Sequence, residues 1–291
     1  MSDIPLIPDG GRVIAAVDAS AHARGVADLA AWAAQRLGVP LEVLHAIERD
    51  ATRPPADFSG SLSLGSQETL LAELAAHDEQ RGQLAQRQGR AMLDQARAHL
   101  RASAGVEAEA RLRHGALVDA LTDVEAHVRL FVIGQRGAHD DGTPLHLGRN
   151  LERAIRAVQR PVLVAARPTG TIRRFAIAFD GSATAQRCVE LVAASPLLQG
   201  LDCHLVTVGA DDRHAPARAA ALAILQAAGF RPTPIVLGGA PDEALRVHVA
   251  TEHVDLLVMG AYGHSRLHRL IVGSTTTRVL QTTRVPVLLL R

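Results

Sequence analysis

Short apolar segments alternate with amphipathic stretches of helical spacing along the whole chain. The apolar segments lie near residues 12–17, 40–47, 107–113, 130–134 and 161–165, and again near 174–179, 203–208, 232–237, 255–260 and 285–290. The first and fourth segments of each set are almost wholly apolar, which is typical of strands buried on both faces. The pattern predicts an α/β fold in which open parallel sheets carry helices on both faces.

Two sequence motifs occur once in each half of the chain. RVIAAVDAS, which contains Asp18, matches RFAIAFDGS, which contains Asp180. LFVIGQRG around Gly134 matches LLVMGAYG around Gly260. Because the motifs stand in the same order in both halves, the chain is predicted to be a tandem repeat of one unit.

The two units differ in length between these motifs. We place the first domain at residues 1–166 and the second at residues 172–291. The first is longer in its middle, where residues 53–66 are rich in Ser, Gly and Pro and are expected to form a loop. Residues from about 67 to 101 have the spacing of one long polar helix.

Composition limits the partners of the chain. The 31 basic residues are all Arg and are balanced by 30 acidic residues, leaving a formal net charge of +1, and only 2% of residues are aromatic. Neither a basic surface nor stacking side chains therefore favour nucleic acid. No apolar run approaches the roughly 18 residues of a membrane span, and MSDIPLIPDGG has no signal-peptide pattern, so we expect a cytoplasmic protein without a membrane partner. Cys188 and Cys203 are interpreted as core residues.

A glycine motif in the second unit indicates a phosphate site. From Gly260 the sequence reads G-A-Y-G-H-S-R-L-H-R-L-I-V-G-S-T-T, so nine residues separate Gly263 from Gly273. Glycine allows the backbone to approach a ligand closely. Ser274 and Thr275 stand where the last helix is predicted to begin, and a helix start offers unpaired N–H groups to an anion.

Asp180 is predicted to face the same crevice. Ligands of open parallel sheets bind at the carboxyl ends of strands where the strand order reverses, and Asp180 ends the first strand of the unit. Its carboxylate could accept hydrogen bonds from a ribose hydroxyl or a base amine. The structural alternative is that the glycines only form turns, and that Asp180 and Ser274 only cap helices.

At these residues the chain resembles the universal stress protein family, whose nucleotide-binding members carry G-x2-G-x9-G-[S/T]. Gly260, Gly263, Gly273 and Ser274 match that spacing, and Asp180 matches the acid that ends the family's first strand. The resemblance implies two tandem five-stranded sheets of order 3-2-1-4-5, Rossmann-like and similar to the adenine nucleotide alpha hydrolases. It also implies ATP or another adenine nucleotide, with or without Mg²⁺.

The resemblance extends to further site residues and to association. Met259 and Val208 fall where family members line the adenine pocket, and Thr275 falls where a backbone N–H meets phosphate. The tandem copies are expected to pair through their last strands as an intramolecular pseudo-dimer. Self-association into a dimer of tandem chains is also implied, and no protein partner can be named.

The first unit departs from the glycine motif. Ten residues rather than nine separate Gly137 from Gly148, and Arg149 and Asn150 replace the Ser-Thr pair. A bulky Arg would occupy the space of a phosphate, and two aspartates in the intervening loop would repel it. We therefore predict that the first unit does not bind ATP in the same way. The alternative is that Arg149 itself pairs with an acidic ligand.

Three kinds of function remain open. The first is a nucleotide-responsive stress protein whose output is binding, and the second is a slow ATP hydrolase or an autokinase with Ser274 or a neighbouring Thr as acceptor. The third is a ligand-free interaction module. The sequence lacks GxxxxGK[ST] and GxSxG, and no paired carboxylates or general base stand near the glycine loop, which favours binding over catalysis. His264 and His268 lie four residues apart, but no third metal ligand stands at a suitable spacing from them.

Overall fold

The computed structural model describes residues 10–48, 64–137, 147–166, 170–209, 214–261 and 274–290. Side chains are described from residue 73 in the long helix of the first half. The first half contains β1 (Arg12–Ala16), α1 (Ala23–Leu37), β2 (Leu41–Ile47), α2 (Leu64–Ala104), β3 (Ala108–His114), α3 (Leu117–Val124), β4 (Val128–Gly134), α4 (Arg149–Ala157) and β5 (Val162–Ala165). The second half contains β6 (Arg174–Ala178), α5 (Ala183–Ala194), β7 (Asp202–Val208), α6 (Ala215–Ala227), β8 (Pro232–Leu237), α7 (Pro241–Thr251), β9 (Leu256–Gly260), α8 (Ser274–Thr282) and β10 (Val287–Leu290).

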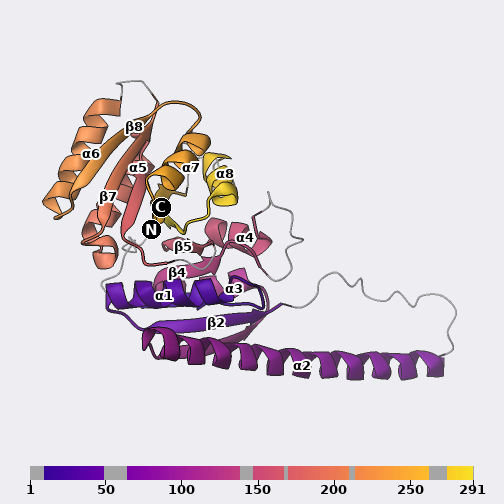
Figure 1. The fold of residues 1–291 in the computed structure, drawn as a ribbon. Coiled ribbons are helices and arrows are strands. Elements are labelled where there is room, and N and C mark those ends of the chain that lie inside the picture. Colours follow the sequence, from indigo (N-terminus) through magenta and orange to yellow (C-terminus); the bar gives the residue numbers. More distant parts are fainter. Residues whose placement is uncertain are drawn as a thin grey trace.

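The described strands form one sheet of order β3-β2-β1-β4-β5-β10-β9-β6-β7-β8 (Figure 1). Within each half the neighbouring strands are parallel and follow the predicted order 3-2-1-4-5. The halves meet at β5 and β10, which run antiparallel with Val164 opposite Val287 and Val162 opposite Leu289. The two predicted five-stranded sheets are therefore joined through their last strands as a pseudo-dimer within one chain.

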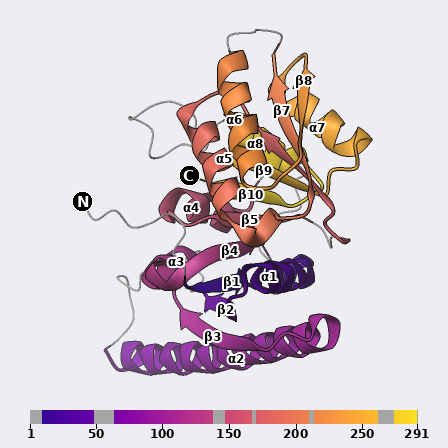
Figure 2. The same cartoon turned by 90° about the vertical axis from the view of Figure 1, so that its left-hand side faces the viewer.

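Helices from both halves cover each face of the sheet (Figure 2). Side chains of α1, α2, α5 and α6 belong to one buried apolar cluster, and side chains of α3, α4, α7 and α8 belong to the other. Alternation along β1 explains the division, because Val13 and Ala15 face the first cluster while Ile14 faces the second. The prediction of helices on both faces is thus confirmed.

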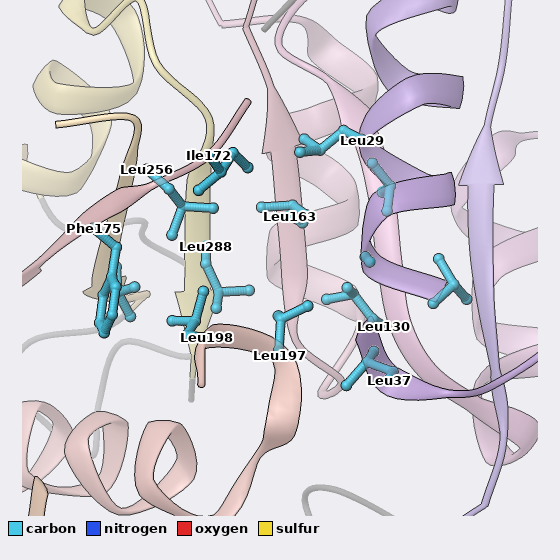
Figure 3. Close-up of a cluster of buried hydrophobic side chains, with 14 of the residues drawn as sticks. Leu29, Leu37, Leu130, Leu163, Ile172, Phe175, Leu197, Leu198, Leu256 and Leu288 are labelled. Carbon is cyan, nitrogen blue, oxygen red and sulfur yellow. The ribbon is translucent and has the colours of Figure 1, made fainter. Parts of the chain in front are cut away.

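The first cluster crosses the seam between the halves without a break (Figure 3). Leu130 and Leu163 of the first half lie beside Leu197 and Leu288 of the second, and each is at most 4% exposed. Burying one such leucine contributes about 1.5–3 kcal/mol. Arg36 Nε also donates a hydrogen bond to Leu197 O at 2.6 Å. The halves therefore share a core as well as a strand pairing.

The long helix α2 has 41 residues and extends slightly beyond the predicted range. Its C-terminal part packs over β2 and β3, where Arg97 Nε donates to Ala108 O at 2.9 Å. Its N-terminal part runs past the edge of the first half (Figure 1). Residues 75–84 are exposed there, in keeping with their polar sequence. The described helices include none that is long and apolar enough to cross a membrane.

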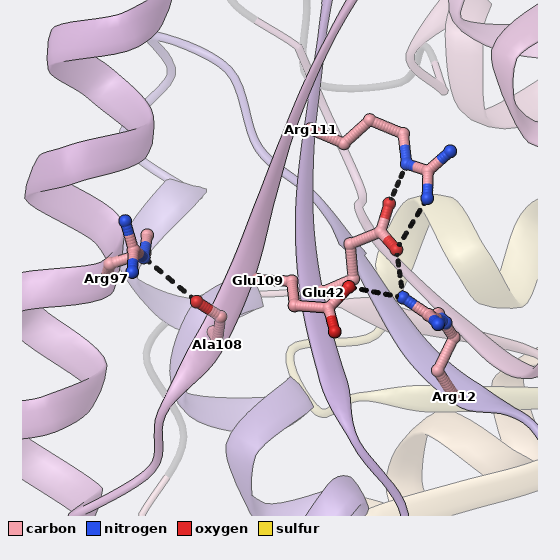
Figure 4. Close-up of polar contacts among 6 residues, drawn as sticks. All are labelled: Arg12, Glu42, Arg97, Ala108, Glu109 and Arg111. Carbon is pink, nitrogen blue, oxygen red and sulfur yellow. Dashed lines mark hydrogen bonds and ion pairs between the residues drawn. The ribbon is translucent and has the colours of Figure 1, made fainter.

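A buried carboxylate connects the first three strands (Figure 4). Glu42 of β2 is 1% exposed and accepts hydrogen bonds from Arg12 Nη1 at 2.6 Å and Arg111 Nη2 at 3.2 Å. Arg12 Nη1 also donates to Glu109 Oε2 at 2.6 Å. The bonds to Glu109 and Glu42 raise the pKa of Arg12. Two guanidinium groups thus compensate the buried charge, which would otherwise cost several kcal/mol.

The two cysteines lie in the core of the second half, as predicted. Cys188 and Cys203 are both buried and form no disulfide. Burial raises the pKa of both thiols to about 12. At neutral pH they are protonated and therefore weak nucleophiles.

Candidate functional site

Three neighbouring strands of the second half end at one edge of the sheet. β6 lies between β7 and β9, with Ala178 level with Val206 and Ile177 level with Val258. The chain leaves β6 for α5 on one face and β9 for α8 on the other. In open parallel sheets, ligands bind where neighbouring strands are followed by crossovers to opposite faces, as β6 and β9 are here. Of the predicted candidate residues, the described ones lie at these strand ends or at the start of α8: Asp180, Val208, Met259, Gly260, Ser274 and Thr275.

Asp180 stands two residues beyond β6 and is exposed. Its Oδ1 accepts a hydrogen bond from Ser182 N at 2.9 Å, and Ser182 Oγ accepts one from Ala185 N at 3.1 Å. These bonds form the turn that leads into α5. One carboxylate oxygen of Asp180 therefore has a structural role in the turn before α5. The other oxygen, Oδ2, forms no hydrogen bond with the part of the chain that the structure describes.

The turn after Asp180 depends on a close contact with α6. Gly181 has φ of +76°, and a Cβ at this position would lie 3.0 Å from His214 Cγ. His214 is the residue that precedes α6. No sequence pattern connects this histidine with Gly181, because its position is set by the packing of α6 beside α5.

The end of β9 is packed closely against the start of α5. Met259 is 5% exposed and belongs to the apolar cluster on the α8 face. A Cβ on Gly260 would lie 2.8 Å from Thr184 Cγ2 and 3.7 Å from Cys188 Sγ. Glycine at 260 therefore permits α5 to lie against the strand end, whether or not a ligand is present.

The first turn of α8 is fixed to the end of β9. α8 begins at Ser274, as predicted, and Ser274 and Thr275 are exposed. Thr276 is 6% exposed, and its Oγ1 donates a hydrogen bond to Gly260 O at 3.3 Å. The two ends of the glycine motif are therefore adjacent, with the exposed hydroxyls of Ser274 and Thr275 at the positive end of a helix dipole.

The middle of the glycine motif lies outside the described residues, which stop at Ala261 and resume at Ser274. The roles assigned to Gly263 and Gly273 therefore stay predictions, as does the interpretation of His264 and His268.

Val208 ends β7 and is half-buried. It packs against the same apolar cluster that contains Met259, as does Ala178 at the end of β6. In the sheet, Val208 is paired with Leu237 of β8. Val208, Asp180 and Gly260 thus lie at or just beyond the ends of three adjacent strands.

Histidines stand near the corresponding strand ends of the first half. Asp18 Oδ1 accepts a hydrogen bond from Ser20 N at 2.9 Å, as Asp180 does from Ser182. His22 occupies the position of Thr184, so that a Cβ on Gly134 would lie 3.3 Å from His22 Cβ. The edge that carries a threonine in the second half therefore carries an imidazole in the first.

The hydrogen bonds of these imidazoles determine their tautomers. His22 Nδ1 is bonded to Ala166 O, and His45 Nδ1 lies 2.8 Å from Val17 O. Because a carbonyl oxygen only accepts, both rings carry a proton on Nδ1. Comparing the two halves position by position would have identified both histidines from the sequence. Arg149 is exposed as the first residue of α4.

The profile of the universal stress protein family matches residues 11–166 and 209–291. The chain belongs to the universal stress protein family. Within this family, universal stress protein Slr1230 of Synechocystis is 34% identical over 286 residues, which cover 96% of this chain and 99% of the relative. Universal stress protein MJ0577 of Methanocaldococcus jannaschii is 31% identical over 67 residues, covering 23% of this chain and 41% of the relative.

The tandem fold also has a counterpart among solved structures. A universal stress protein from Archaeoglobus fulgidus superposes with a TM-score of 0.73 at 19% identity, covering 96% of this chain and 98% of that one. At this identity the likeness concerns the fold. The likeness extends over both halves of this universal stress protein.

Proposed function

We propose that this universal stress protein binds ATP or another adenine nucleotide, with or without Mg²⁺, at the carboxyl edge of its second half. The observation that carries the proposal is the intact G-x2-G-x9-G-S motif, whose ends meet where Thr276 is bonded to Gly260 beside the exposed Asp180. The residues proposed to bind the nucleotide are Asp180, Val208, Met259, Gly260, Gly263, Gly273, Ser274 and Thr275.

The phosphates would lie at the start of α8. Ser274 and Thr275 present hydroxyls and N–H groups that have no partner within the helix, and both residues are exposed. Gly273 and Gly263 would allow the loop backbone to approach the same oxygens. The site is suited to an anion because the helix dipole places partial positive charge there.

The nucleoside would lie over the ends of β6, β7 and β9. Asp180 Oδ2 would accept a hydrogen bond from a ribose hydroxyl or a base amine. Val208 and the backbone of Met259 and Gly260 would contact the base, since their strand ends are adjacent.

We infer that the output is nucleotide-dependent binding rather than turnover. In the first half, Arg149 replaces Ser274 at the helix start and Leu151 replaces Thr276, so one nucleotide per chain is expected. The two halves already pair within the chain through β5 and β10. Association of two such chains is a separate expectation that light scattering would measure.

Calorimetric titration with ATP tests the proposal. The matched variant is Ser274→Arg, which gives the second half the residue that begins α4 in the first. Because α4 forms with Arg at this position, the variant is expected to fold, and unchanged thermal unfolding would verify it. Wild-type protein should bind one ATP and Ser274→Arg none.

The same samples separate the alternatives. Steady release of ADP would support a slow hydrolase, and transfer of labelled phosphate to Ser274 would support an autokinase. Absence of binding by wild-type protein would contradict the proposal and leave a ligand-free interaction module.

A further inference from the structure

Helix α8 runs from the proposed nucleotide site to the first half of the chain. Because β5 and β10 are antiparallel, the carboxyl ends of the first-half strands lie at the edge where β10 begins. α8 immediately precedes β10, so its last turn reaches that edge while its first turn stays at the nucleotide edge. A nine-residue helix is a rigid element about 13 Å long.

α8 is held at both ends by hydrogen bonds from different halves. At its first turn, Thr276 Oγ1 donates to Gly260 O at 3.3 Å within the second half. At its last turn, Gln135 Nε2 of the first half donates to Leu280 O. The last carbonyls of a helix lack partners within the helix, so Gln135 satisfies a group that α8 cannot satisfy itself.

The backbone of Gln135 is held by the end of β5 and by the last glycine of the first half's degenerate glycine motif. Its N–H donates to Ala165 O at 2.8 Å at the end of β5. Its carbonyl accepts a hydrogen bond from Gly148 N at 3.2 Å, directly before α4. The side chain that reaches α8 is therefore held by the strand end and the helix start of the degenerate motif.

The residue equivalent to Gln135 in the second half cannot make the same contact. The equivalent of Gln135 in the second half is Ala261, whose N–H donates to Leu290 O at 2.9 Å in the same way. Alanine has no donor to offer the last turn of α4. The degenerate motif thus contacts the helix of the intact motif through Gln135, whereas Ala261, the described residue at the equivalent position, offers no such side-chain donor.

We propose that Gln135 is a positioning residue through which the first half sets the orientation of α8 and thereby the affinity of the second half for its nucleotide. The inference rests on the function proposed above and assigns a regulatory role to the half that lacks the Ser-Thr pair. By linkage, a nucleotide at Ser274 stabilises the contact at Leu280, and with it the start of α4.

Two substitutions of Gln135 isolate the hydrogen bond. Gln135→Glu keeps the shape but places a carboxylate, which cannot donate when ionised, against the Leu280 carbonyl. Gln135→Ala removes the contact without adding repulsion, and serves if the Glu variant folds poorly. Gln226→Glu makes the same charge change on the exposed C-terminal part of α6, on the opposite face from α8.

Calorimetric titration of the full chain with ATP should show affinity weakened about three- to tenfold by Gln135→Ala and more by Gln135→Glu, as expected for one hydrogen bond. Gln226→Glu should bind like wild-type protein. A second readout is hydrogen exchange: ATP should slow exchange in residues 149–157 of wild-type protein, and this response should be lost in Gln135→Glu. A residue that only stabilises the fold would leave that response in place.

The outcomes distinguish the two proposals. Wild-type protein that binds ATP with Gln135 variants of unchanged affinity would overturn this inference and leave the nucleotide site standing. Wild-type protein that does not bind ATP would overturn the proposed function and this inference with it.

Discussion

Val164 of β5 and Val287 of β10 are partners in the antiparallel ladder that joins the two halves. Because of this pairing, the strands of the two halves run in opposite directions within one sheet. The carboxyl ends of the first-half strands therefore lie at one edge of the sheet, and those of the second-half strands lie at the other. The last helix of each half therefore extends from its own glycine motif towards the motif of the other half. The tandem arrangement thus brings Gln135 to Leu280, although 145 residues separate them in the chain.

Asp180→Asn is expected to weaken ATP binding by about tenfold or more, because a hydrogen bond to a charged group is worth about 1.5–3 kcal/mol. Asparagine keeps the oxygen that accepts from Ser182 N, so the turn should persist. Asp18→Asn is the matched control, since Asp18 accepts from Ser20 N at the same 2.9 Å distance in the first half. Equal effects of the two substitutions in an ATP titration would contradict the assignment of the site to the second half.

Gly260→Ala is expected to lower the free energy of unfolding by about 1–3 kcal/mol, the usual cost of overpacking. The added Cβ would lie 2.8 Å from Thr184 Cγ2. Thr184→Ala removes that methyl group, so the double variant should recover part of the loss in urea unfolding. Strict additivity of the two effects would show that the Cβ collides with something else.

Glu42→Leu is expected to destabilise the protein by about 1–3 kcal/mol, because it removes the carboxylate that the partly exposed Arg12 and Arg111 share, while Arg12 keeps its bond to Glu109. Glu107→Gln is the control, since it breaks an exposed pair with Arg101 and should matter much less. Urea unfolding of both variants provides the comparison. Similar effects would mean that the buried cluster contributes no more than a surface pair.

Stability is expected to fall in mild acid because of a buried histidine pair. His204 Nδ1 lies 3.1 Å from His248 Nε2, and the two residues are 8% and 5% exposed. Burial lowers the pKa of both, and the nearby Arg174 lowers them further, whereas Asp202 and Glu252 act in the opposite direction on His204. Charge repulsion from His204 also lowers the pKa of His248, and Glu252 offsets part of that lowering.

The sign follows from the lowered pKa values. Above the ordinary histidine pKa of 6.5 both histidines are neutral in the folded and in the unfolded chain, so they do not reduce the free energy of unfolding. As pH falls below that value the unfolded chain binds protons first, so the free energy of unfolding decreases until the folded pKa values are passed. Urea unfolding at pH 7.5 and 5.5 should show this loss, and His248→Gln should reduce it. An unchanged pH dependence in the variant would assign the effect to other groups.

Much of the architecture could be predicted from the sequence because it depends on local pattern. The strands buried on both faces are continuous apolar runs, and all ten predicted segments correspond to strands within a few residues. The start of α8 at Ser274 and the burial of Cys188 and Cys203 followed from the same reasoning. The strand order and the pairing of the last strands came from the resemblance to the family.

The contacts that could not be predicted depend on tertiary packing. Gln135 reaches Leu280 only because β5 and β10 pair antiparallel, and His214 meets Gly181 only because α6 lies beside α5. His204 and His248 are brought together by a strand and a helix that neither pattern nor spacing connects. The ligand roles of the site residues stay predictions, as do the domain boundaries.

The nucleotide content of the protein as purified tests whether the second half holds an adenine nucleotide. Protein prepared without added nucleotide would be denatured, and the released small molecules separated by ion exchange, beside Ser274→Arg prepared in the same way. A nucleotide site in the second half predicts adenine nucleotide in wild-type protein, up to one per chain, and none in the variant. Wild-type protein that releases none and shows no thermal shift with added ATP would contradict it.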